Sequence, residues 1–167
     1  MTPSESQQFL SPDRFRELMS RFASGVTILT TLDDRDRPHG MTVSAFSSLS
    51  LVPPLVLVCV DRSATMLDVL DRATYFAVSV LSESQVALSR RFSLEEMELR
   101  FEGVAHSSGI SGVPRIDGAL MVVECRRRER FDAGDHAIFV GEVIGGSHDP
   151  EGRPLVHWSG TYGRMER

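Results

Sequence analysis

Lysine and asparagine are both missing from this 167-residue chain, so all 18 basic residues are arginine. Without lysine, the chain cannot form a Schiff base through a lysine amine, and it cannot build a phosphate-binding P-loop. The 18 basic residues face 23 acidic ones, which gives a net charge of −5. This charge argues against binding to a nucleic-acid backbone or to an anionic membrane, and we expect neither as a partner.

Cysteine is also scarce, and Cys59 and Cys125 lie far apart without a CxxC pair. We interpret them as small buried side chains in a reducing compartment. The histidines show no spacing typical of metal ligands, so we expect no metal. The N-terminal MTPSESQQF has no features of a signal peptide, and Pro53-Pro54 interrupts the longest apolar run. That run is shorter than the ~20 residues of a membrane span, so we expect a cytoplasmic protein.

Short β-branched runs separated by turn residues dominate the sequence and predict antiparallel strands with few helices. Ser11-Pro12 is typical of a helix start, and this helix is expected to end at Gly25. We expect one domain over 11–167, a closed or nearly closed barrel with a few decorating helices, after a flexible segment over 1–10. The expected strands are 26–31, 39–43, 55–60, 75–81, one near residue 104, 119–130, 137–147 and 155–158, and further helices are expected over 65–71 and 82–91.

The segment from Gly40 to Ser50 carries five hydroxyl side chains within nine residues, directly before the two prolines. Hydroxyls at this density suit an anionic or polyol ligand, because side-chain oxygens and backbone N–H groups can converge there. The alternative is a loop rich in serine and threonine that caps its own backbone. Composition alone leaves both interpretations open.

Arg62-Ser63-Ala64-Thr65 follows the expected strand over 55–60 and is expected to open the short helix after it. The N–H groups of a helix N-terminus and the guanidinium of Arg62 would together form a seat for a phosphate. Alternatively, Ser63 or Thr65 only caps the helix. The residues themselves favour neither hypothesis.

Seven stretches of the sequence follow one another in a recognisable order: GVTILTT (25–31), PHGMTVSAFSSLSLVPPLVLVCV (38–60), FAVSVLS (76–82), RF (100–101), DGAL (117–120), AGDHAIFVGEV (133–143) and GRPLVHWSGTY (152–162). In order and spacing the chain resembles the flavin reductase family from about residue 12 to 163. The resemblance implies a homodimeric, six-stranded antiparallel split barrel that binds FMN, or FAD in some relatives, and that oxidises NADH or NADPH.

The resemblance also implies roles for individual residues. His136 would position the nicotinamide, and Tyr162 would close over the site. Ser79 stands where relatives often have asparagine, a departure that bears on its ligand contact. Phe46 and Phe101 are the aromatic residues expected to touch the flavin. The remaining expected flavin-binding residues are Thr42, Val43, Ser44, Ala45 and Ser47 along the ring and ribityl chain, and Arg62, Ser63 and Thr65 at the phosphate.

The function implied is NAD(P)H:flavin oxidoreductase, which would supply reduced flavin to a partner monooxygenase. Hydride transfer between two cofactors needs no side-chain nucleophile, so the protein's task is to hold two flat rings with the reacting atoms about 3–3.5 Å apart. The chain shows no GxGxxG between a strand and a helix, which argues against Rossmann-type binding of NADH. The alternative is a flavin-binding barrel without turnover that serves as an electron carrier, store or sensor.

Overall fold

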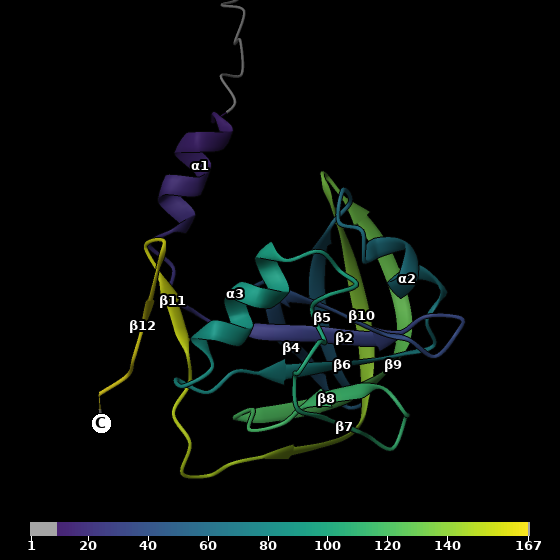
Figure 1. Cartoon of the computed structure of the whole chain (residues 1–167). Helices are drawn as coiled ribbons and strands as arrows, with labels where there is room; N and C mark the ends of the chain where they lie inside the picture. Colours follow the sequence, from purple (N-terminus) through teal and green to yellow (C-terminus); the bar gives the residue numbers. More distant parts are fainter. Residues whose placement is uncertain (1–9, 167) are drawn as a thin grey trace, which may run out of the picture.

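Strands are the main secondary structure of the computed structural model, which describes residues 10–166 (Figure 1). The three helices of these residues are α1 (Pro12–Met19), α2 (Leu67–Arg72) and α3 (Val86–Leu94). The strands are β1 (Ser24–Gly25), β2 (Thr27–Leu32), β3 (Pro38–Val43), β4 (Phe46–Leu51), β5 (Pro54–Asp61), β6 (Tyr75–Val80), β7 (His106–Ser108), β8 (Pro114–Ile116), β9 (Met121–Ala133), β10 (His136–His148), β11 (Val156–Trp158) and β12 (Thr161–Gly163).

The largest sheet is antiparallel throughout and has the strand order β3-β2-β6-β9-β10-β5-β4. Its two outer strands, β3 and β4, follow each other in the chain with only Ser44 and Ala45 between them. One bent segment therefore pairs with β2 through its first half and with β5 through its second half, and this closes the sheet into a barrel. The expected mainly antiparallel barrel is confirmed. The sheet has seven strands, and the expected six result when β3 and β4 are taken as one.

The barrel core is filled by side chains that alternate along the strands, as the two-residue period of a strand requires. In β5, Val56, Val58 and Val60 are buried, and the residues between them are half-buried. Phe76 and Phe139 are fully buried against them. The interior is therefore packed with side chains, so a ligand of any size must bind outside it.

Helix α1 begins as expected, because the hydroxyl of Ser11 accepts a hydrogen bond from the N–H of Arg14 at 3.3 Å. It ends at Met19, well before the expected end at Gly25. Every residue of α1 remains at least partly exposed in the described part of the chain. Figure 1 shows α1 extending away from the barrel beside the hairpin of β11 and β12. The apolar side chains of Phe15, Leu18 and Met19 in this helix thus lie uncovered.

The two other helices begin later than the sequence suggested. Helix α3 starts at Val86 instead of residue 82, although the N–H of Ser82 donates to Gln85 Oε1 at 3.0 Å, as in one half of a capping box. Helix α2 starts at Leu67 instead of residue 65. The strand expected near residue 104 lies at β7, where it pairs with β8. None of the helices among residues 10–166 is both long enough and apolar enough to span a bilayer.

The long hairpin of β9 and β10 turns at Gly134, whose positive φ of 63° favours glycine. The strands expected over 119–130 and 137–147 correspond to β9 and β10, which continue to Ala133 and from His136. At the C-terminal side, β11 pairs with both β1 and β12. The segment expected to be flexible lies, apart from Leu10, outside the described residues.

Candidate functional site

The hydroxyl-rich segment lies where the chain passes from β3 to β4. Val43 is buried, and its carbonyl accepts a hydrogen bond from Thr27 Oγ1 at 2.7 Å. The carbonyl of Ala45 accepts a hydrogen bond from the N–H of Cys59 at 2.9 Å. Ser44 and Ser47 are exposed. The backbone of this segment is thus anchored on both sides, while its serine side chains face outward.

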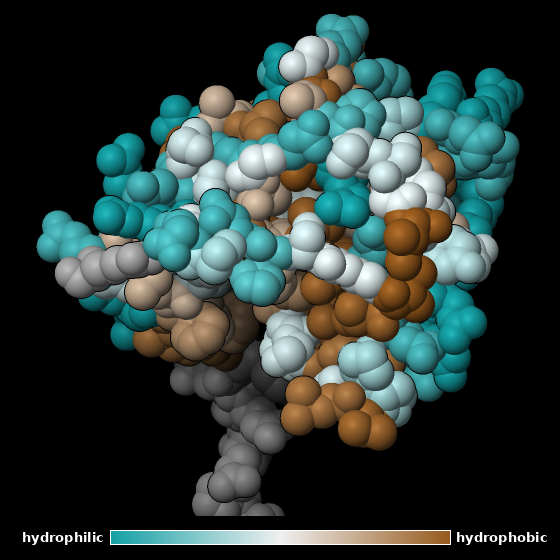
Figure 2. All heavy atoms as spheres, turned by 90° about the horizontal axis from the view of Figure 1, so that it is seen from below, coloured by the Kyte–Doolittle hydropathy of each residue, from teal (hydrophilic) through white to brown (hydrophobic). Residues whose placement is uncertain are grey.

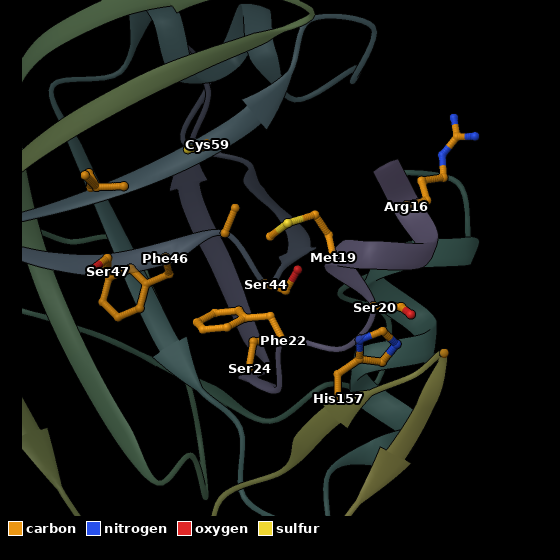
Figure 3. A pocket seen from close by; sticks show the side chains of 13 residues that line it. Arg16, Met19, Ser20, Phe22, Ser24, Ser44, Phe46, Ser47, Cys59 and His157 are labelled. Atoms are coloured by element: carbon orange, nitrogen blue, oxygen red, sulfur yellow. The ribbon is translucent and has the colours of Figure 1, made fainter. Parts of the chain in front are cut away.

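A hollow of about 730 Å³ lies beside this segment, between α1 and the strands β4 and β5 (Figure 3). Figure 3 shows the side chains of Met19 and Phe22 directed toward Ser44 and Phe46. The lining is mostly apolar with several hydroxyls, which is the usual character of a small-molecule site. The lining residues are Arg16, Met19, Ser20, Phe22, Ser24, Ser44, Ala45, Phe46, Ser47, Leu57, Cys59, His157 and Gly160.

A smaller hollow of about 160 Å³ lies on the other side of Ser44 and is also lined by Thr42, Ser89 and Tyr162. The Tyr162 hydroxyl lies 2.8 Å from Ser89 Oγ, and Thr42 Oγ1 donates to the carbonyl of Ser89 at 2.7 Å. His157, which also lines the large hollow, packs edge-on against Tyr162 with ring centres 5.7 Å apart. The C-terminal hairpin therefore forms one wall of both hollows.

A third hollow, of about 230 Å³, brings together the two segments that the sequence analysis singled out. Thr42 lies on one wall, and Ala64 and Thr65 lie on another, with Ser93 and Arg100 beside them. Thr42 and Thr65 are far apart in the sequence, and the barrel places them at one site. Since Thr42 also lines the 160 Å³ hollow, the three hollows form a continuous surface along β3 and β4.

Arg62 and Ser63 do not start helix α2, so that expectation was wrong, and neither Ser63 nor Thr65 is its N-cap. Both the N–H and the hydroxyl of Ser63 donate to Asp61 Oδ1, each at 2.7 Å. These bonds from Ser63 hold the pKa of Asp61 below its usual range. The side chain of Arg62 is exposed. Residues 61–63 therefore form a closed turn whose polar groups bind one another.

His136 begins β10 directly opposite Asp61 at the end of β5. Its Nδ1 lies 2.7 Å from Asp135 Oδ1, and its side chain is 42% exposed. The N–H of Arg62 donates to the carbonyl of Asp135 at 2.9 Å, which fixes the hairpin tip against the turn. The structure thus brings His136 next to the segment 61–63, with an exposed ring.

Two residues implicated by sequence lie away from the hollows. Ser79 is fully buried in β6, where its hydroxyl oxygen accepts a hydrogen bond from the N–H of Ile116 at 3.2 Å. Phe101 packs edge-on against Phe92 and His106, with ring centres 5.0 and 5.1 Å apart. Neither lines any of the three hollows among residues 10–166. A ligand contact of either residue stays a prediction.

The sequence analysis missed several residues that the fold brings to these hollows, among them Ser89, Arg100 and His157. Arg100 and His157 fall within the stretches RF and GRPLVHWSGTY, so those stretches were the available signal. Ser89 lies in α3 outside any such stretch, and only the tertiary fold shows that it contacts Thr42 and Tyr162. Among the described residues, no group of three or more histidine, cysteine or acidic side chains is placed to hold a metal ion.

Comparison with known proteins identifies the family of this chain. Residues 19–166 match the family described as flavin reductase like domain. The chain is 41% identical to FMN reductase (NADH) SmoA of Agrobacterium fabrum, over 92% of this chain and 86% of the relative. It is 42% identical to the reductase component of 4-hydroxyphenylacetate 3-monooxygenase of Thermus thermophilus, over 92% and 96%. The structure of NADH:FAD oxidoreductase SgcE6 of Streptomyces globisporus, in complex with NAD and FAD fragments, superposes with a TM-score of 0.88 at 35% identity, covering 95% and 97%.

Proposed function

Because the chain belongs to the family of flavin reductase like domains, we propose that it is an NAD(P)H:flavin oxidoreductase that reduces FMN or FAD. The meeting of Thr42 and Thr65 at one hollow is the observation that carries this proposal. It gives the two ligand-binding segments expected from sequence a common site on the barrel surface. We also propose that residues 11–167, as far as the structure describes them, form one flavin-binding domain.

The residues at the hollows fit a flavin. The large hollow offers the apolar side chains of Met19, Phe22 and Phe46 for a flat ring, with Ser44 and Ser47 at its border. Thr42 through Ser47 would contact the ring and the ribityl chain, and the hollow at Thr65 would take the phosphate end. When bound, the flavin accepts hydride at its ring, a reaction that the protein assists through orientation and exclusion of water.

Reduction also needs a place for the nicotinamide. The large hollow has a volume of about 730 Å³, and His136 is an exposed polar group at a hairpin tip beside the 61–63 turn. We assign to His136 the positioning of the nicotinamide cofactor. Relatives named for NADH favour NADH over NADPH as the donor. Three relatives are named as reductase subunits or components of monooxygenases, which favours a monooxygenase as the acceptor of the reduced flavin.

The exposed apolar face of α1 favours contact with a second copy of the chain. Phe15, Leu18 and Met19 of α1 are each about half exposed, and Phe22 is 73% exposed. Apolar side chains gathered on one uncovered helix face are typical of an interaction surface. Met19 and Phe22 also line the large hollow, so a partner protomer packed on α1 would cover this side of the site. A homodimer is therefore the assembly that we propose.

Loss of absorbance at the nicotinamide band tests the activity directly. Purified protein is mixed with NADH and excess FMN, and the assay is repeated with FAD and with NADPH. We expect catalysed oxidation of at least one nicotinamide that depends on added or bound flavin. Flavin binding without any catalysed oxidation in the four combinations would instead support the carrier, store or sensor role.

A further inference from the structure

The residues directly after helix α1 are joined to the tip of the β11–β12 hairpin. The N–H of Ser159 donates to the carbonyl of Ser20 at 2.9 Å. Trp158 Nε1 donates to the carbonyl of Arg21 at 3.2 Å, and the guanidinium carbon of Arg21 lies 4.4 Å from the ring centre of Trp158. Arg21 Nη1 also donates to Ser159 Oγ at 3.4 Å. We call these contacts the Arg21–Trp158 clamp.

The hairpin tip has the geometry that this contact needs. Ser159 and Gly160 have positive φ angles of 52° and 76°, as the central residues of a two-residue type I′ turn do. In such a turn the N–H of the first central residue has no partner within the hairpin. Ser20 supplies that partner through its carbonyl. The turn and the end of α1 therefore complement each other.

Helix α1 is tied to the rest of the chain by little else. Its polar side chains bond one another, as Arg14 does with Glu17 at 2.6 Å, and none of its residues is buried. No carboxylate of residues 10–166 lies within 4.0 Å of the guanidinium of Arg21. The charge of Arg21 is therefore free to bind an aromatic ring, and the clamp is what fixes the end of α1 to the hairpin.

Both sides of the clamp carry residues that line the large hollow of about 730 Å³. Met19 and Phe22 flank the clamp residues after α1, and His157 and Gly160 flank those of the hairpin tip. Figure 3 shows Met19 and Phe22 on the side of α1 and His157 on the hairpin. The clamp thus joins two walls of the hollow that lie far apart in the sequence.

Arg21 and Trp158 lie behind these walls. Neither side chain lines any of the three hollows formed by the described residues. Arg21 is exposed and Trp158 is 43% exposed, and a cation–π contact at an exposed site shifts an equilibrium by about two- to five-fold. If the clamp opens, the apolar lining for a flat ring becomes incomplete. The apparent affinity for the ring then falls with the fraction of molecules whose wall is complete.

We propose that Arg21 and Trp158 are positioning residues for the flavin ring, because their clamp holds the end of α1 and the C-terminal hairpin together as one wall of the large hollow. This inference rests on the proposed function and adds two residues that act on the ring through their neighbours. It locates the effect at the ring. FMN and riboflavin, which share the ring and ribityl chain and differ in the phosphate, should therefore respond equally.

Fluorescence tests the clamp without any flavin, because Trp158 is the only tryptophan of the chain. Arg21→Gln should increase the quenching of Trp158 by acrylamide, since one face of the ring loses its cover. Arg21→Lys should keep part of the protection, because an ammonium group also binds the face of a ring. Arg14→Gln is the matched control, an arginine of α1 that bonds only within the helix. Unchanged quenching in Arg21→Gln would overturn the clamp.

Titrations with FMN and with riboflavin, followed by flavin fluorescence, test the effect on the ring. We expect Arg21→Gln to weaken the binding of both flavins by about two- to five-fold, with Arg21→Lys between it and the wild type. In steady-state NADH oxidation the KM for FMN should rise by the same factor. The kcat at saturating FMN should stay unchanged, because a bound ring keeps the wall in place. Arg14→Gln should behave as the wild type.

A double variant tests whether the two residues act together. Trp158→Phe keeps an aromatic ring but loses the Nε1–H donor to the carbonyl of Arg21. The double variant of Arg21→Gln and Trp158→Phe should weaken FMN binding less than the product of the two single effects, since both changes break the same clamp. Effects that multiply fully would contradict a shared clamp.

Two results would overturn the positioning role while leaving the proposed function intact. One is wild-type affinity for both flavins in Arg21→Gln despite increased quenching. The other is a loss of affinity accompanied by a lower temperature of thermal unfolding, since Arg21 would then only support the fold. Failure of the wild type to bind either flavin would reject the proposed function and the positioning role with it, and the quenching of Trp158 would still report whether the clamp forms.

Discussion

At the scale of single residues, His136 is held in place by neighbours of known geometry. Its Nδ1 lies 2.7 Å from Asp135, and its strand neighbour across the sheet is Asp61. The side chain is 42% exposed, so it can meet a ligand that approaches the hairpin tip. A polar group so placed can orient a second cofactor without contacting the first.

His136→Ala is expected to lower kcat/KM for NADH by about five-fold, the effect of losing one net hydrogen bond of about 1 kcal/mol. The dissociation constant for FMN should stay unchanged. His148→Ala is the control, because His148 is an exposed histidine at the other end of the same strand. Steady-state kinetics with varied NADH at saturating flavin measures the effect. Equal losses for NADH and FMN would contradict the assignment.

The hydroxyl of Tyr162 gives a second prediction at this scale. Ser89 is fully buried, and its Oγ lies 2.8 Å from that hydroxyl. Tyr162→Phe should lower the free energy of unfolding by about 1–3 kcal/mol, because a buried polar group loses a partner. Urea denaturation measures the loss. The double variant with Ser89→Ala should lose less unfolding free energy than the two single variants lose together, since both changes remove the same bond.

Sequence analysis could predict much of the site but not its three-dimensional detail. Thr42, Ser44 and Thr65 were singled out from hydroxyl density and family resemblance, and the structure brings them to adjoining hollows. Ser63 was expected to face a ligand, yet it bonds Asp61, because an aspartate two residues earlier offers a closer acceptor. Arg100 could not be placed, because its contact with Gly40 joins residues sixty positions apart.

At the scale of elements, the fold was predictable where local pattern and tertiary packing agree. The hairpin of β9 and β10 follows from alternating apolar residues around a glycine turn. Helix starts were placed too early at α2 and α3, since turn residues before a helix resemble caps in sequence. The joint between β3 and β4 could not be found from the residues, because it depends on which strands each half pairs with.

The side chain of Glu124 in β9 holds the segment between α3 and β9 against the sheet. Glu124 is almost fully buried, and both the N–H and the hydroxyl of Ser111 donate to its Oε2, at 3.0 and 2.8 Å. Arg115 lies 3.6 Å away. Burial alone would raise the pKa of Glu124, but the bonds from Ser111 and the charge of Arg115 outweigh it and lower the pKa.

A carboxylate with a lowered pKa stabilises the fold above its unfolded pKa, near the ordinary value of 4.5, and this contribution disappears as the pH falls through the folded value. Glu124→Gln should therefore be less stable than the wild type at pH 7. The difference in unfolding free energy should shrink steadily below about pH 4.5. Urea denaturation of both proteins across this range measures it, and other acidic groups cancel in the comparison. A difference that does not depend on pH would contradict the role of the charge.

At the scale of the whole molecule, α1 is the feature that the barrel alone does not explain. Figure 2 shows that the molecule also exposes apolar residues on the face seen from below, between polar ones. The exposed apolar side chains of α1 differ from these residues because they share one face of the helix. This apolar face also extends to the lining of the large hollow. Helix α1 also carries the ion pair of Arg14 and Glu17 at 2.6 Å.

Leu18→Asp should convert the proposed dimer to a monomer, because a charge on the apolar face of α1 would be buried without a partner. Glu17→Gln, on the same helix, should leave the dimer intact. Light scattering coupled to size exclusion measures the mass. Thermal unfolding of the barrel is the control, since α1 contributes no buried residue to the described protomer. A wild-type monomer, or a dimer unaffected by Leu18→Asp, would exclude this interface.

The passage from β3 to β4 has a consequence for the lifetime of the protein. Pairing with β2 stops at Val43 and pairing with β5 begins at Phe46, with one register shift between Ser48 and Ser50, so the ring of strands is interrupted at Ser44 and Ala45 beside the proposed ligand. A flavin bound there would add contacts at this interruption, and by mass action it would disfavour local opening. Proteases that cleave transiently opened chains would then degrade the empty form first. The supply of flavin would in this way set how long the protein persists as well as how fast it works.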